Sequence, residues 1–143
     1  MEVLPALGDP PPEEAIGAAV RALSAGQVVA IPTDTVYGLA ADAFRTGAAE
    51  RIFALKARPR HVDLPVLVAE AAQAWSLVES FPPAAEALAE RFWPGALTLV
   101  LPRRVGLQAD LGSDEFTIGV RCPDHPVPVS LCRRAGPLAT TSA

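Results

Sequence analysis

Short apolar runs that alternate with alanine-rich stretches limit this chain to few architectures. Each run is short, and prolines and polar turns bound them, as is typical of buried strands. We predict strands at 28–31, 37–41, 64–69, 97–101, 117–122 and 137–142. We predict helices at 13–25, 46–57, 83–92 and 127–134, and a further one around Trp75. Helices interleaved with strands in this way predict an α/β fold, with a sheet covered on its faces.

Two of the predicted helices carry clear end signals. Glu13 and Glu14 follow several prolines and favour the positive end of a helix dipole, while Gly26 is placed to end that helix. Thr46 is expected to cap the second helix through its hydroxyl.

Length and composition favour a single, cytoplasmic domain. The chain has 143 residues, which is enough for one well-packed core. No apolar run approaches the roughly 18 residues of a membrane span, and the acidic, proline-containing start differs from a signal peptide. Cys122 and Cys132 match no metal-ligand or C-x-x-C spacing, so we expect both to be buried and reduced.

Lys56 is the only lysine, against eleven arginines, and it stands two residues before Arg58. An ammonium beside a planar guanidinium suits a polyphosphate. Arg51 and Arg60 lie in the same stretch, so a local anion site is expected in a protein whose net charge of −4 disfavours broad binding to nucleic acid. A solvated helix end, where cations favour the dipole, explains the same residues from the sequence equally well.

Several catalytic motifs are missing from the sequence. It contains no G-x-x-x-x-G-K-[ST] loop, and no G-x-G-x-x-G follows the first predicted strand, which argues against P-loop and dinucleotide sites. His61 and His125 lack the spacing of a zinc site. Ser130 and Ser142 lack the elbow sequence of a serine hydrolase.

What remains is a set of hydroxyls and cations near the predicted strand ends, where α/β sheets form ligand crevices: Thr33, Thr35, Lys56, Arg58, Thr117, Arg121, Thr140, Thr141 and Ser142. Hydroxyls hold small zwitterions and cations neutralise phosphates, which suits phosphoryl or nucleotidyl transfer. For any single threonine, a plain strand-face residue is the simpler interpretation. Arg121 is expected to face a pocket or pair with an acid, Asp34 to close its own turn, and His125 to lie in a turn.

Five ordered segments resemble the YrdC/Sua5 family of threonylcarbamoyl-AMP synthases. They are Pro-Thr-Asp-Thr-Val-Tyr-Gly-Leu at 32–39, Lys-Ala-Arg-Pro at 56–59, Trp-Pro-Gly-Ala-Leu-Thr at 93–98, Gly-Val-Arg-Cys-Pro-Asp-His-Pro at 119–126 and Pro-Leu-Ala-Thr-Thr-Ser-Ala at 137–143. The segments keep the family's order and spacing, and together they span most of the chain after Gly26.

The resemblance implies a fold and a reaction. The fold is YrdC/RibB-like: a mixed α/β domain whose twisted mixed β-sheet, flanked by helices, surrounds a concave, positively lined pocket. The reaction is nucleotidyl transfer, in which ATP, L-threonine and bicarbonate give threonylcarbamoyl-AMP and pyrophosphate with Mg²⁺ present. The product would feed partner enzymes that make threonylcarbamoyladenosine next to the tRNA anticodon.

Matched position by position, the resemblance implies a role for each of two sets of residues. The ATP set, with the catalytic residues Lys56 and Arg58 on the phosphates, is Lys56, Arg58, Val62, Thr117 and Ser142. The threonine set, with Arg121 on the carboxylate, is Thr33, Thr35, Leu67, Arg121 and Thr140. No metal ligand is implied. A carbamate oxygen attacking the α-phosphate needs alignment and a stabilised leaving group, and no general base is required.

Three departures from the family pattern stand out. Ala96 replaces a proline in the fourth of the family's W-P-G-P-L-T positions. Asp63 stands where the family usually has proline, and its carboxylate is expected either to weaken ATP binding or to help hold Mg²⁺. The family reads S-A-N where this chain ends with Ser142-Ala143, and it continues for several more strands and helices. We therefore expect one YrdC-like domain, 1–143, incomplete at its C-terminus and ending on a strand with an unpaired edge.

Three other interpretations stay open beside the enzyme. One is a module that binds tRNA or other RNA through the same basic concavity without chemistry, which the net charge disfavours. Another is a relative of carbamoyltransferases, which would need a further domain for carbamoyl phosphate. The third is an inactive fragment.

Overall fold

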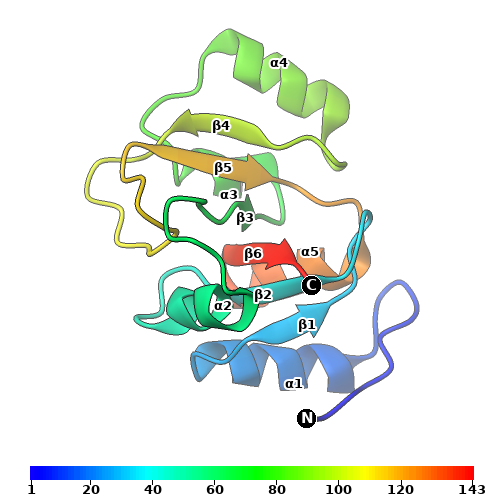
Figure 1. Cartoon of the computed structure of the whole chain (residues 1–143). Coiled ribbons are helices and arrows are strands. Elements are labelled where there is room, and N and C mark those ends of the chain that lie inside the picture. Colours follow the sequence, from blue (N-terminus) through cyan, green and yellow to red (C-terminus); the bar gives the residue numbers. More distant parts are fainter.

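The computed structural model describes residues 1–143, and its six strands form one mixed sheet in the order β1-β2-β6-β3-β5-β4 (Figure 1). The strands are β1 (Val29–Ile31), β2 (Gly38–Asp42), β3 (Val66–Leu67), β4 (Leu99–Pro102), β5 (Thr117–Arg121) and β6 (Leu138–Ser142). β3 and β5 run parallel, and all other neighbours pair antiparallel. The predicted mixed α/β sheet is therefore confirmed.

Helices cover both faces of this sheet. They are α1 (Glu13–Ser24), α2 (Ala48–Lys56), α3 (Ala71–Trp75), α4 (Pro83–Phe92) and α5 (Pro126–Ala135). On one face Ile52 and Phe53 of α2 join a core with Val66 of β3, whereas on the other face α1 and α5 pack on the neighbouring Leu67. Successive strand residues thus enter opposite cores, as the pleat requires.

Each predicted helix and strand is present, with small shifts at the ends. β3 is shorter than the predicted 64–69, although the amides of Leu64 and Val68 still bond to neighbouring segments. The predicted cap at Thr46 is wrong: Gly47 precedes α2 with φ 80° and makes no side-chain cap bond. Glycine adopts this left-handed conformation without the steric cost that threonine would meet, so the helix starts one residue later.

The last strand lies inside the sheet. β6 pairs with β2 on one side and β3 on the other, and β1 and β4 form the edges (Figure 1). The expectation that this strand has an unpaired edge is therefore wrong, because the order of strands in the sheet differs from their order in the chain.

Both cysteines are free and buried, as predicted. Burial raises the pKa of Cys132 to about 12 and also raises the pKa of Cys122, so both thiols stay protonated at neutral pH. Among the helices, none has the length and apolar character needed to cross a membrane.

Candidate functional site

Arg58 ties the end of α2 to the end of β6. Its Nε donates to the carbonyl of Val62 at 2.6 Å, and its two terminal nitrogens donate to the carbonyl of Asp63 at 2.6 Å and to Oγ1 of Thr141 at 3.2 Å. A guanidinium has five N–H groups, so two stay available to a ligand. All three acceptors are neutral, and no ion pair balances the charge of Arg58.

The sequence Lys56-Ala57-Arg58 forms a sharp helix end. Lys56 is the exposed last residue of α2 and takes part in no ion pair. Ala57 adopts φ 47°, a left-handed cap conformation usually reserved for glycine, and the amide of Arg58 bonds back to the carbonyl of Phe53 at 3.0 Å. Lys56 and Arg58 therefore lie at a helix end, as the alternative interpretation predicted, and neither cation has an ion-pair partner.

At the end of β6, Thr33 lies close to Thr141, which accepts a hydrogen bond from Arg58. Gly38 pairs with the exposed Ser142, and a Cβ built on Gly38 would lie 3.3 Å from the carbonyl of Thr141 and 4.0 Å from Cγ2 of Thr33. Thr140 is buried, and its hydroxyl lies 3.4 Å from the carbonyl of Pro65. Residues of both predicted sets therefore meet at this strand end.

Thr33 shapes the loop between β1 and β2. Its Oγ1 accepts a hydrogen bond from the amide of Thr35 at 3.2 Å and donates to the carbonyl of Val36 at 2.5 Å. Oγ1 of the exposed Thr35 lies 3.2 Å from Oγ1 of Thr33. The loop is thus held in shape by its own side chains, with Asp34 in the middle.

Asp34 reaches across to the end of β5. One terminal nitrogen of Arg121 donates to Oδ1 of Asp34 at 2.7 Å and to the carbonyl of Gly95 at 3.1 Å, while the amide of Asp124 donates to Oδ2 of Asp34 at 3.0 Å. Figure 1 shows the cyan β1–β2 connection beside the orange segment after β5. Asp34 was expected only to close its own turn, but its carboxylate also joins this loop to Arg121 of β5 and to the amide of Asp124 that follows the strand.

The ion pair of Asp34 and Arg121 is shielded from solvent. The exposed fractions of the two side chains are 14% and 11%. Burial by itself raises the pKa of Asp34, but the hydrogen bonds from Arg121 and Asp124 and the charge of Arg121 outweigh it and lower the pKa below its usual range. The carboxylate is therefore ionised at neutral pH.

One edge of the Arg121 guanidinium has no protein partner. Both protons of the nitrogen that contacts Asp34 and Gly95 have acceptors, whereas Nε and the other terminal nitrogen have no protein partner. No buried side-chain nitrogen lacks a hydrogen-bond partner, so these two atoms reach the surface. Leu67 is buried beside Arg121 in the parallel pair.

Thr117 lies against a loop that Asp63 holds. Its hydroxyl donates to Oδ2 of Asp114 and so lowers the pKa of that carboxyl. Oδ1 of Asp63 accepts from the amide of Asp114 at 3.3 Å. Asp63 and Thr117 also line a cavity of about 190 Å³. The Asp63 carboxylate thus has a structural partner in this loop.

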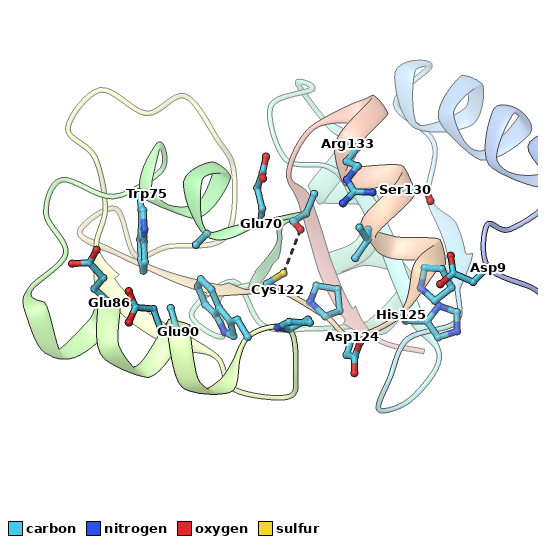
Figure 2. Close-up of a pocket in the computed structure, with 18 residues that line it drawn as sticks. Asp9, Glu70, Trp75, Glu86, Glu90, Cys122, Asp124, His125, Ser130 and Arg133 are labelled. Atoms are coloured by element: carbon cyan, nitrogen blue, oxygen red, sulfur yellow. Dashed lines mark hydrogen bonds between the residues drawn. The ribbon is translucent and has the colours of Figure 1, made fainter.

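A larger cavity, of about 660 Å³, lies between α4 and α5 and contains none of the predicted ATP or threonine residues. Its charged side chains are Asp9, Glu70, Glu86, Glu90, Asp124 and Arg133, with His125 beside them. Figure 2 shows Glu86 and Glu90 near Trp75 at one end, and Ser130 and Arg133 at the other. Five carboxylates against one arginine make this cavity unsuitable for a polyphosphate. The positively lined pocket implied by the resemblance stays a prediction.

Sequence reasoning missed some contacts and placed His125 imprecisely. The partners Asp34 and Arg121 are 87 residues apart, and no sequence signal joins them. Thr141 belongs to the hydroxyls near the predicted strand ends, and the sequence assigns it no substrate. His125 precedes α5 and accepts the amide of Val127 on Nδ1 at 3.1 Å, so it caps a helix.

A family model for Sua5/YciO/YrdC proteins, described as "Telomere recombination", matches residues 21–143. The chain belongs to the Sua5/YciO/YrdC family. A Mycobacterium tuberculosis relative is 45% identical over 128 residues, which are 90% of this chain and 59% of the relative. The Bacillus subtilis threonylcarbamoyl-AMP synthase is 42% identical over 130 residues, which are 90% of this chain and 38% of that enzyme. The chain thus spans 38% to 59% of the length of these relatives.

Solved structures of the Sua5/YciO/YrdC family support the fold. The structure of P. abyssi Sua5 complexed with L-threonine matches with a TM-score of 0.86 and 38% identity, over 92% of this chain and 39% of that one. E. coli YciO matches with a TM-score of 0.82 and 25% identity, over 92% of this chain and 64% of that one. The resemblance drawn from the five sequence segments is confirmed.

Proposed function

We propose that this chain carries the substrate site of an L-threonylcarbamoyladenylate synthase, a nucleotidyltransferase that joins ATP, L-threonine and bicarbonate. The observation that carries the proposal is the pair of differently charged cation sites that the fold builds. Arg58 and Lys56 are uncompensated, whereas Arg121 is neutralised by Asp34 and keeps a free edge. A polyanion suits the first site and a zwitterion suits the second.

The threonine site is assigned to Thr33, Thr35, Leu67, Arg121 and Thr140. The free edge of Arg121 matches the two oxygens of a carboxylate. Thr33 and Thr35 offer hydroxyl groups on the facing loop. The P. abyssi relative, 38% identical, was solved with L-threonine, which supports this ligand for the present chain.

The ATP site is assigned to Lys56, Arg58, Val62, Thr117 and Ser142. Two free N–H groups on Arg58 and the ammonium of Lys56 would neutralise phosphate oxygens. The carbonyl of Val62 holds Arg58 in place. Thr117 and Ser142 are both exposed at strand ends, so their hydroxyls are accessible to a nucleotide.

The reaction then needs placement and charge neutralisation. The amine of threonine and bicarbonate give a carbamate and water. A carbamate oxygen attacks the α-phosphorus of ATP, the bond to the bridging oxygen breaks, and pyrophosphate leaves. Lys56 and Arg58 would stabilise the charge that develops on the leaving pyrophosphate.

The chain itself offers no cage for Mg²⁺. No group of three or more His, Cys, Asp or Glu side chains is arranged to hold a metal ion. Asp63, the carboxylate nearest in sequence to the phosphate residues, already accepts the amide of Asp114. Mg²⁺ at such sites is usually bound through one or two carboxylates and the substrate phosphates, so the ion would come with the ATP phosphates.

The cellular setting follows from the product. Threonylcarbamoyl-AMP is an activated acyl-adenylate, so enzymes that modify tRNA would consume it. Free, buried thiols suit a reducing compartment, and we place the reaction in the cytoplasm. Direct binding of tRNA is not part of the proposal, because the net charge of −4 opposes it.

The test is a product assay together with two binding measurements. The purified chain is incubated with ATP, L-threonine, bicarbonate and Mg²⁺, and threonylcarbamoyl-AMP is sought by mass spectrometry. Omitting threonine or bicarbonate in turn should abolish the product. Because the relatives are longer, ATP and L-threonine binding are also measured by calorimetry. A folded chain that binds neither ligand would refute the proposed site.

A further inference from the structure

We propose that Asp34 is a positioning residue that holds Arg121 in the orientation needed to bind the carboxylate of the amino-acid substrate. The inference rests on the proposed function, in which Arg121 is the carboxylate ligand. Asp34 itself would not touch the reacting atoms, because both of its oxygens are occupied by protein donors.

The first argument is orientation. The nitrogen of Arg121 that faces Asp34 donates both of its protons, one to Asp34 and one to the carbonyl of Gly95. Because the guanidinium is planar, fixing one nitrogen by two bonds fixes the plane of the whole group. The two remaining nitrogens are then presented as a fork with a set direction.

The second argument is assembly. Asp34 lies between Thr33 and Thr35, and its other oxygen is held by the amide of Asp124 after β5. One carboxylate therefore joins the loop that carries two predicted threonine ligands, Thr33 and Thr35, to the strand that carries Arg121. These two segments do not neighbour each other in the sheet, since β6 and β3 lie between β2 and β5.

The third argument is charge. With Asp34 ionised, the pair is neutral overall, so an incoming amino acid meets a balanced site in which its own ammonium is not repelled. A lone arginine would favour phosphates and other anions as well. Asp34 would thus keep the Arg121 site selective for a zwitterion.

A purely structural ion pair is the competing explanation, because both side chains are mostly buried and removal of one leaves the other unpaired. A structural role predicts a loss of stability that weakens both ligands alike. A positioning role predicts a loss confined to threonine and dependent on Arg121.

The experiment measures the binding of L-threonine and ATP to the full chain and to its Asp34→Asn and Asp34→Glu variants. Asp34→Asn should weaken L-threonine about ten-fold and leave ATP unchanged. Asp34→Glu keeps the negative charge, but its extra methylene moves the guanidinium, so it should also lose threonine affinity. Glu13→Gln is the matched control, because it breaks the exposed ion pair with Arg134 and should change neither ligand.

Two further measurements separate orientation from stability. The wild-type chain should prefer L-threonine to L-threoninamide, and Asp34→Asn should lose much of this preference because the fork no longer meets the carboxylate. In an Arg121→Lys background, Asp34→Asn should have no further effect on threonine binding.

The outcomes are distinguishable from a failure of the proposed function. If the wild-type chain binds no L-threonine, the proposed function fails. If it binds L-threonine and both Asp34 variants bind it equally well, the positioning role is wrong. A parallel loss of threonine and ATP binding, with the preference over threoninamide retained, would also overturn it in favour of a structural ion pair.

Discussion

Arg58 and Arg121 are both predicted to meet substrate, and the protein holds them in opposite ways. Three neutral oxygens surround Arg58, whereas a carboxylate and one carbonyl hold Arg121. Each arginine retains free N–H groups, so the difference lies in the charge that reaches a ligand.

In the proposed function, this difference would let the two sites distinguish a polyphosphate from a zwitterion. Around Arg58 the unpaired Lys56 adds a second positive charge, and such a site attracts a polyphosphate most strongly. Asp34 neutralises the charge of Arg121, so this site would recognise its ligand through the geometry of hydrogen bonds. The Arg58 site would therefore be sensitive to the loss of charge, and the Arg121 site to the loss of alignment.

The largest expected effect is the loss of charge at Lys56. Lys56→Ala should lower threonylcarbamoyl-AMP formation by about 100-fold or more, because one stabilising charge on the leaving group is removed. L-Threonine binding should not change, which would separate the two sites. The melting temperature should stay within error, since an exposed, unpaired cation adds little stability. Mass spectrometry, calorimetry and a thermal melt measure these three quantities.

Arg51→Ala is the matched control for Lys56, because Arg51 is another exposed cation of α2 that forms no ion pair. It should leave product formation near the wild-type rate. Equal losses in both variants would mean that α2 acts through its overall charge, and the special role of Lys56 would then be wrong.

A smaller effect is expected from pH at the Arg121 site. The folded-state pKa of Asp34 lies below its usual value near 3.8, so the ion pair adds stability above that value and loses it as the pH falls through the folded-state pKa. The difference in unfolding free energy between wild type and Asp34→Asn should therefore be constant from pH 8 to pH 5 and shrink below about pH 4. Urea unfolding at several pH values measures it. A difference that already shrinks near pH 6 would contradict the lowered pKa.

The contrast between the two arginines also marks what sequence reasoning could reach. The strands and helices were predictable because apolar runs and proline or glycine stops are local signals. The pairing of Lys56 with Arg58 was visible for the same reason, since the two residues are neighbours. The uncharged hydrogen-bond acceptors around Arg58 were less predictable, because they are the hydroxyl of Thr141 and backbone carbonyls that any residue provides.

The sequence predicted that Arg121 would face a pocket or pair with an acid, and the ion pair confirms the second alternative, but the sequence did not identify Asp34 as the partner. Asp34 follows a strand and precedes a threonine, where closing its own turn is the usual role. The contact crosses β6 and β3, which are inserted between β2 and β5 in the sheet, and the order of residues along the chain does not signal it. The same insertion explains why the last strand was wrongly expected to have a free edge.

The smallest expected effect concerns how the Arg58 site is built. Ala57 adopts φ 47°, where an L-residue is strained by about 1 kcal/mol and glycine is not. Ala57→Gly should relieve about 1 kcal/mol of strain and lose about 0.4–1 kcal/mol to the greater freedom of the unfolded chain, which leaves a net stabilisation between about zero and 0.6 kcal/mol. Ala54→Gly is the control of opposite sign, because Ala54 lies exposed inside α2 and glycine there should cost about 0.5–1 kcal/mol. Urea unfolding of both variants measures these changes. If Ala57→Gly destabilised the fold as much as Ala54→Gly, the left-handed turn that directs Arg58 toward β6 would be contradicted.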